Sequence, residues 1–241
     1  SADRSVSELL RSDARTLRQA SKNLNDGVSL INVAEGGLNE QTSILTRLRE
    51  VLSVAGGAID QNTRGTLQLE INTLKDEFNR IATGTDFIGL KLLDGTLGRS
   101  VTTSKQITIS TGLNSDEESQ LNLNKLVDIE STDTSSLGLD GISTSSFEKS
   151  VDSLAQVEAA QETILGYRAS IGATQNRLVR ALATLNVSVE NLYAANSVIS
   201  DADIAEEVAN LTKQQLLVQS SAAMVGQANL IPEGVLLLLQ Q

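Results

Sequence analysis

The sequence contains no cysteine, histidine or tryptophan, and only one proline, three phenylalanines and two tyrosines among its 241 residues. Without cysteine there are no disulfides or thiol nucleophiles, and without histidine the commonest metal ligand and the usual general base are missing. An apolar content drawn mainly from Leu, Ile, Val and Ala is typical of long helices packed along seams. The near absence of proline agrees, because proline interrupts helices. The composition therefore predicts long helices and disfavours metal and thiol enzymes.

Acidic residues outnumber basic ones by 30 to 19, giving a formal net charge of −11. This balance disfavours nucleic acid as a partner, and it makes copies of the chain repel one another unless apolar burial or salt offsets the repulsion. No apolar run reaches the ~18 residues of a membrane span, so no membrane partner is expected. The first residues are charged and amphipathic, so no cleavable secretory signal peptide is expected.

A seven-residue period predicts a first long helix over residues 4–55. Such a period places one apolar seam on a helix. The turn-like glycines at 27 and 36–37 do not shift this period and are interpreted as helical, whereas Gly56 and Gly57 follow its end and predict a helix stop. The seam residues are Leu10, Leu17, Leu24, Ile31, Leu38, Leu45 and Leu52.

A second helix is predicted over residues 62–83, where apolar residues recur in steps of three and four, and a short connection favours an antiparallel helix pair. Residues 86–146 are rich in Gly, Ser, Thr, Asn and Asp. Within them, alternating residues at 106–110 and 120–124 predict a β-hairpin with its tip at 112–119. This hairpin is too small to fold alone, so we expect it to lie on the helices.

Helical periodicity returns after a predicted capping box formed by Ser145 and Glu148. A seam with the same period predicts a helix over residues 150–198 that packs along both earlier helices. Its members are Val157, Ile164, Ile171, Leu178, Leu185, Leu192 and Ile199.

A last helix is predicted to begin with a cap at residues 200–203 and to end at Pro232. Its seam consists of Ile204, Leu211, Val218 and Val225, and the apolar end at 235–239 includes Leu236 and Leu239. Nothing else in the chain offers these side chains a burial site. We therefore expect this region to pack against another copy or partner, and to be poorly packed in an isolated chain.

No catalytic, cofactor or metal site is predicted. The acidic residues at 201, 203, 206 and 207 are interpreted as favourable charges at a helix start. Those at 116–118 lack the ligand spacing of a calcium loop. The serines have no histidine base, and the glycine-rich steps lack the lysine of a phosphate-binding loop.

The sequence thus predicts a mainly α fold, an elongated antiparallel helical bundle resembling a coiled-coil rod, with a small β-hairpin excursion. Its predicted divisions are 1–85 for the first two helices, 86–147 for the β-hairpin and irregular segment, 148–199 for the third helix and 200–241 for the last.

Several strings resemble bacterial flagellins, in the order that the family shows. They are QASKNLNDGVSLINVAEGGLNE (19–40), LTRLRE (45–50), FIGLKLLDG (87–95), SIGATQNRL (170–178), SDADIAEEVANLTKQQLL (200–217) and QANLIPEGVLLLL (227–239).

The resemblance implies a structural subunit of the extracellular flagellar filament, used in motility, that polymerises with other flagellin subunits. It also implies an export chaperone and a filament cap as partners, no large outer domains, and absence of the family's extreme N-terminal segment, whose helix pairs with the C-terminal one. The six apolar residues from Ile204 to Leu239 named above would then pack in the filament core. The alternatives are the hook-filament junction protein, which shares the rod architecture, and a surface adhesin or hydrolase.

The resemblance further implies that Arg47, Val51 and Glu70 fall on the surface read by the Toll-like flagellin receptor. A helix-face charge pair and filament packing are the alternative reading of these residues. One departure from the family pattern is Ile88, which stands where asparagine is typical.

Overall fold

The computed structural model describes residues 2–113, 116 and 119–239, and no burial is assigned to the side chains of 2–4, 202–203 and 229–239. The chain forms two compact units. The main unit holds residues 16–188, and the terminal unit holds residues 1–15 together with 189–241. The fold is mainly helical with two small antiparallel strand pairs, as the sequence predicts.

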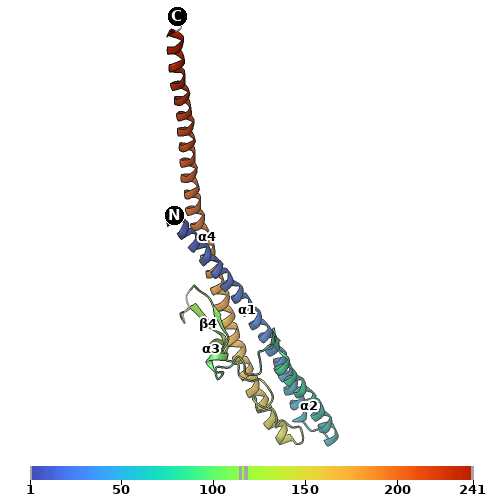
Figure 1. The fold of residues 1–241 in the computed structure, drawn as a ribbon. Helices are drawn as coiled ribbons and strands as arrows, with labels where there is room; N and C mark the ends of the chain where they lie inside the picture. Colours follow the sequence, from blue (N-terminus) through green and yellow to red (C-terminus); the bar gives the residue numbers. More distant parts are fainter. Residues whose placement is uncertain (1, 114–115, 117–118, 240–241) are drawn as a thin grey trace. The chain divides into compact units, whose positions relative to one another are not determined.

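Three helices contribute to the main unit: α1 (Ala2–Ala55), α2 (Gln61–Gly84) and α4 (Phe147–Leu239). Within residues 16–188 they lie side by side (Figure 1). Polar pairs show that α1 and α4 are antiparallel, since the α4 partner number falls as the α1 number rises. From one end to the other they are Ser21–Asn186, Asn32–Gln175, Glu35–Arg168 and Arg49–Glu158. Helix α2 is antiparallel to α1, with Glu70 paired to Arg47.

The predicted seams form the core of the main unit. Leu24 on α1 and Leu178 on α4 are both fully buried, as the antiparallel bundle requires. Seam side chains that are at most 7% exposed are Leu17, Leu24, Ile31, Leu38, Leu45 and Leu52 on α1, with Val157, Ile164, Ile171, Leu178 and Leu185 on α4. The predicted stop is also confirmed, because α1 ends at Ala55 just before Gly56.

Two glycines inside α1 let the irregular segment approach the helix closely. A Cβ at position 27 would lie 2.3 Å from Ile109 Cδ1, and a Cβ at position 37 would lie 2.8 Å from Leu93 Cδ1. Real Cβ atoms essentially never come this near to another heavy atom, so only glycine fits without a shift. The helix continues through both positions, as the seven-residue period predicts.

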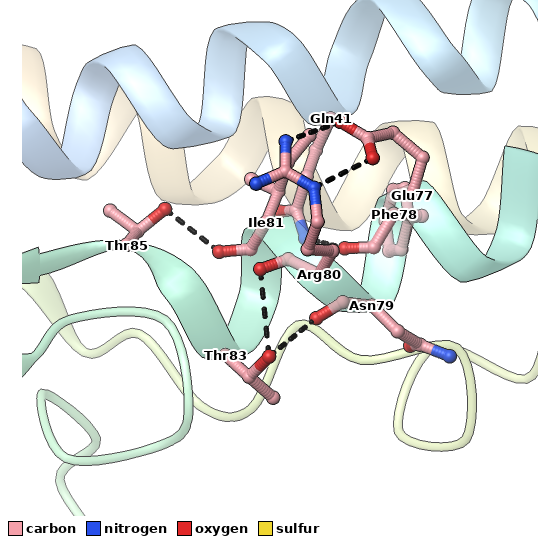
Figure 2. Close-up of polar contacts among 8 residues, drawn as sticks. All are labelled: Gln41, Glu77, Phe78, Asn79, Arg80, Ile81, Thr83 and Thr85. Carbon is pink, nitrogen blue, oxygen red and sulfur yellow. Dashed lines mark hydrogen bonds and ion pairs between the residues drawn. The ribbon is translucent and has the colours of Figure 1, made fainter.

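Buried polar side chains fix the junctions between segments. The guanidinium of Arg64 donates to the backbone oxygens of Ala55, Gly57 and Thr144, and so satisfies carbonyls at the end of α1. Gln41 is fully buried and donates to the backbone oxygens of Phe78 and Thr132. Figure 2 shows the contact between Gln41 and α2. The two hydrogen bonds of Gln41 together connect α1, α2 and the segment before α4.

Two short hairpins lie in residues 86–122. Strands β1 (Asp86–Phe87) and β2 (Leu90–Lys91) form the first, at a place where the sequence pattern predicts no strands. Strands β3 (Thr108–Ser110) and β4 (Gln120–Asn122) form the second, in the predicted place. Residues 123 and 124 belong to helix α3 (Leu123–Val127) and not to the strand, because Asn122 caps that helix by accepting from the Lys125 N–H. Of the predicted tip at 112–119, residues 114–115 and 117–118 lie outside the described residues.

The remaining irregular segment contains the 3-10 helix η1 (Thr103–Lys105) and a buried asparagine. The Asn124 amide donates to the backbone oxygens of Thr96 and Gly98, and its oxygen accepts from the Ile107 N–H. Eight apolar side chains of this segment are at most 3% exposed and extend the core: Leu92, Leu93, Leu97, Leu123, Val127, Ile129, Leu139 and Ile142. The segment therefore lies on the helices, as expected.

Three sequence expectations about α4 are wrong. Its N-cap is Ser146, whose Oγ accepts from the Lys149 N–H at 3.2 Å, so Ser145 and Glu148 form no capping box. No helix begins at residues 200–203, because α4 runs unbroken from Phe147 to Leu239. Pro232 does not end the helix either; a proline removes one backbone hydrogen bond, and here the helical backbone continues past it.

In the terminal unit, the first residues of α1 contact the continuation of α4. Ser7 Oγ donates to Asn196 Oδ1 at 2.7 Å. Ala14 and Val189 are buried here, whereas Leu10, Leu192 and Ile199 are half-buried. The apolar core of this unit is consequently thin.

Candidate functional site

An apolar stripe runs along α4 in the terminal unit and faces solvent. The side chains of Ile204, Leu211, Val218 and Val225 are 59%, 55%, 68% and 60% exposed. Every side chain between residues 204 and 228 is exposed. Leu236 and Leu239 continue the helix, but their side chains lie outside the described residues.

A second apolar ridge borders the stripe. It consists of Leu216, Leu217 and Met224, which are 57% to 65% exposed. A shallow groove beside it is lined by Ala209, Thr212, Lys213, Leu216, Leu217 and Ser220. The seven-residue period does not indicate this ridge, because it describes only one position in seven. The charge pattern could have revealed it, since Lys213 is the only charged residue between 208 and 228.

This composition is unusual for a helix that faces water. A surface helix normally has one apolar face and one charged face, while a helix that is apolar around most of its circumference is normally buried. Residues 208–228 resemble the buried kind, yet within one copy of the chain they are exposed. The arrangement can therefore act as a contact surface.

The acidic residues next to the stripe have a different setting from the one expected. Asp201, Glu206 and Glu207 lie inside α4 and not at a helix start, so no helix N-terminus is there to attract them. They are exposed, and Asp201 accepts a hydrogen bond from Ser197 Oγ at 3.2 Å. Glu207 is the last charged residue before the stretch 208–228, in which only Lys213 is charged.

Arg47 and Glu70 form an exposed pair between α1 and α2. Arg47 Nε donates to Glu70 Oε1 at 2.8 Å, and Arg47 Nη1 donates to Glu50 Oε2 at 3.0 Å. The hydrogen bond to Glu70, followed by that to Glu50, raises the pKa of Arg47. Val51, one turn further along α1, is only 2% exposed and belongs to the core. The structure thus brings two of the three predicted receptor residues to the surface, and it places the third beneath it.

In the part of the chain that the structure describes, no three Asp or Glu side chains gather in a way that could hold a metal ion. Among the same residues, no helix is both long enough and apolar enough to span a bilayer.

Comparison with known proteins gives family matches in both the N-terminal and the C-terminal part of the chain. Residues 1–97 match the bacterial flagellin N-terminal helical region, and residues 154–239 match the bacterial flagellin C-terminal helical region. The chain is 37% identical to the flagellar filament 30.7 kDa core protein of Treponema maltophilum over 97% of its own length and 83% of that protein's. It is also 37% identical to the flagellin of Bacillus subtilis (strain 168), over 98% and 84% of the two chains. The crystal structure of Bacillus cereus flagellin is similar with a TM-score of 0.56 and 26% identity, covering 68% of this chain and 88% of that one.

Proposed function

The chain belongs to the bacterial flagellin family and is a structural subunit of the flagellar filament, and we propose that residues 204–228 of α4 are its main surface for packing against other copies. The carrying observation is the exposed stretch at 208–228 with the single charge of Lys213. Leu236 and Leu239, further along the same helix, belong to this proposal on sequence grounds.

The energetics favour this surface. Burial of a valine or leucine side chain contributes about 1.5–3 kcal/mol, so four or more such residues per subunit outweigh a moderate electrostatic penalty. The penalty arises because each copy carries a net charge of −11. Salt screens that repulsion, and assembly should therefore strengthen with ionic strength.

Polymerisation after salt addition tests the proposal, with electron microscopy and sedimentation as readouts. Val218→Gln should strongly reduce filament yield, because it places an amide in the apolar contact. Val187→Gln is the matched control, since Val187 is 58% exposed on α4 in the main unit. An undiminished yield from both Val218→Gln and Leu211→Gln would contradict the proposal. Short stubs instead of long filaments from the unaltered protein would favour the hook-filament junction alternative.

Assembly partners follow from the same surface. An exposed apolar helix tends to bind other surfaces before polymerisation. We propose that the flagellar export chaperone covers this helix inside the cell, and that the subunit joins the filament beneath the cap outside. Co-purification of the chaperone from the same bacterium should be lost with Leu211→Gln and kept with Val187→Gln. Equal recovery with both variants would place chaperone binding elsewhere.

The Arg47 and Glu70 pair is proposed as a contact for the Toll-like flagellin receptor. Support comes from its exposed position between α1 and α2, one turn from the buried Val51. Arg47→Ala should reduce activation of a receptor-dependent reporter. Arg80→Ala is the matched control, because Arg80 forms a similar exposed pair with Glu77 on α2. The same reporter response from both variants would contradict the contact.

We also propose that the chain has no catalytic activity, against the alternative of a surface hydrolase or adhesin. Support comes from the family, whose members are structural proteins, and from a sequence without histidine or cysteine. Hydrolysis of peptide or glycan substrates that scales with the concentration of the pure protein would overturn this.

A further inference from the structure

The first hairpin of the irregular segment ends in a tight turn with unusual backbone geometry. Phe87 pairs with Leu90, so only Ile88 and Gly89 connect the two strands. Both connecting residues have positive φ, 52° at Ile88 and 78° at Gly89. A two-residue turn of this kind matches the twist of the strands, and it strongly favours asparagine or glycine at its first position.

Isoleucine is a costly choice at this position. In the left-handed region the Cβ of an L-residue crowds the neighbouring carbonyl, and a β-branched side chain makes the crowding worse. Gly89 escapes the cost because it has no Cβ. Its N–H donates to the Asp86 carboxylate at 3.1 Å, which holds the turn closed.

The rest of the segment imposes this conformation. Leu92 and Leu93 are fully buried, and the Leu92 N–H donates to the Thr85 oxygen at 3.1 Å. Leu93 packs beside Gly37 on α1. The base of the hairpin is therefore fixed, and Ile88 takes the conformation that the short turn requires.

Among the described residues, no burial of the Ile88 side chain compensates for the strain. The Ile88 side chain is 88% exposed, more than any other large apolar side chain in the described part of the chain. An exposed isoleucine contributes no burial, and a strained residue that persists without local benefit points to a role outside its own fold.

We propose that Ile88 is an apolar contact with a second copy of this chain in the filament, an inference that rests on the filament-subunit function. Charge argues for a second copy. Each copy carries a net charge of −11, so contacts between copies are favoured where local charge is low. In this hairpin Asp86 lies directly opposite Lys91, and the two charges offset each other beside the exposed isoleucine. The turn thus presents an apolar tip on a neutral base.

The test exploits two effects of opposite sign. Ile88→Asn relieves the strain and removes the apolar side chain, so it should stabilise the monomer and weaken the filament. We expect its monomer thermal midpoint, measured below the critical concentration, to rise by about 2–4 °C. We expect its critical concentration for polymerisation to rise roughly tenfold. Ile88→Leu keeps the apolar surface and should leave the critical concentration close to that of the unaltered protein.

Each outcome decides the matter. A higher midpoint with unchanged polymerisation would overturn the proposal, because Ile88 would then contact no second copy. A midpoint that does not rise would remove the strain on which the argument stands. A complete absence of filaments from the unaltered protein would instead overturn the proposed packing surface on α4, and the Ile88 contact with it.

Discussion

The hydroxyl of Thr85 occupies the space beside Gly37, since a Cβ on that glycine would stand 2.7 Å from Thr85 Oγ1. Thr85 cannot easily move away, because the same Oγ1 donates to the Ile81 oxygen at 2.8 Å (Figure 2). A Cβ built on Gly36, the residue before Gly37, would have no heavy atom within 4 Å. Substitution by alanine is therefore expected to have opposite effects on stability at these two adjacent glycines of α1.

Gly37→Ala should destabilise the protein, because the clash with Thr85 outweighs the gain in helix propensity. Gly36→Ala should stabilise it by about 0.5–1 kcal/mol, since alanine favours the helix and meets open space. Thermal unfolding of the two variants at equal concentration measures the difference. A stabilised Gly37→Ala variant would show that the irregular segment does not approach α1 this closely.

Leu178→Ala should cost about 2–5 kcal/mol, because it opens a cavity at a fully buried seam position. Val179→Ala, at the next residue, serves as the control because Val179 is 53% exposed. Chemical denaturation of both variants gives the two free energies of unfolding. Equal values would contradict the packing of the seam.

Limited proteolysis should cut near Lys213 first and leave a stable fragment from about residue 4 to residue 200. A helix without tertiary contacts opens readily, whereas the packed main unit opens only with large-scale unfolding. Trypsin treatment of a dilute monomer, followed by mass spectrometry, gives the order of cuts at Lys213 and Arg177, and a protease of broad specificity then trims the exposed end to about residue 200. Resistance at Lys213 equal to that at Arg177 would refute the expectation.

Asp60, the N-cap of α2, should make stability depend on pH. The hydroxyl and then the backbone N–H of Thr63 hold the pKa of Asp60 below its ordinary value of 3.8. A carboxylate with a lowered folded pKa stabilises the fold above its unfolded pKa and loses that contribution as the pH falls through the folded pKa.

Asp60→Asn keeps an oxygen acceptor at the cap but has no charge to titrate. It should be less stable than the unaltered protein at neutral pH, and the gap in thermal midpoint should close as the pH falls below 3.8. A gap that stays constant between neutral pH and about pH 3 would show that the Asp60 charge does not contribute.

The helices of the main unit were predictable because their seams repeat every seven residues over long stretches. That signal correctly outweighed the glycines at 27 and 37. Their positions also carried information that periodicity does not hold, since each faces a side chain from a distant part of the sequence, Ile109 or Leu93. A single sequence shows that a glycine is present and does not show what lies opposite it.

Local signals failed where two neighbouring residues could do the same task. Ser145 and Ser146 are equally good caps, and the sequence pattern favours Ser145 because Glu148 would complete a box with it, whereas the cap in the structure is Ser146. Residues 200–203 look like a helix start, yet the helical backbone passes through them. The hairpin around Ile88 gave no signal, because strands of two residues are too short to show alternation.

The exposure of the stripe on α4 was predictable because its seam had no partner in the chain. Its second ridge at Leu216, Leu217 and Met224 was not, because one residue in seven describes only one side of a helix.

The polar pairs between α1 and α4 solve a problem that the seams create. A seam that repeats every seven residues stays apolar if one helix slides along the other by seven residues, so hydrophobic burial alone leaves several alignments nearly equal. Such a slip would leave the Arg168 guanidinium, which lies 2.9 Å from Glu35, without its half-buried acceptor. It would also separate Gln175 from Asn32 and Asn186 from Ser21. These polar contacts therefore select one register of α1 against α4 among alignments that bury nearly the same apolar surface.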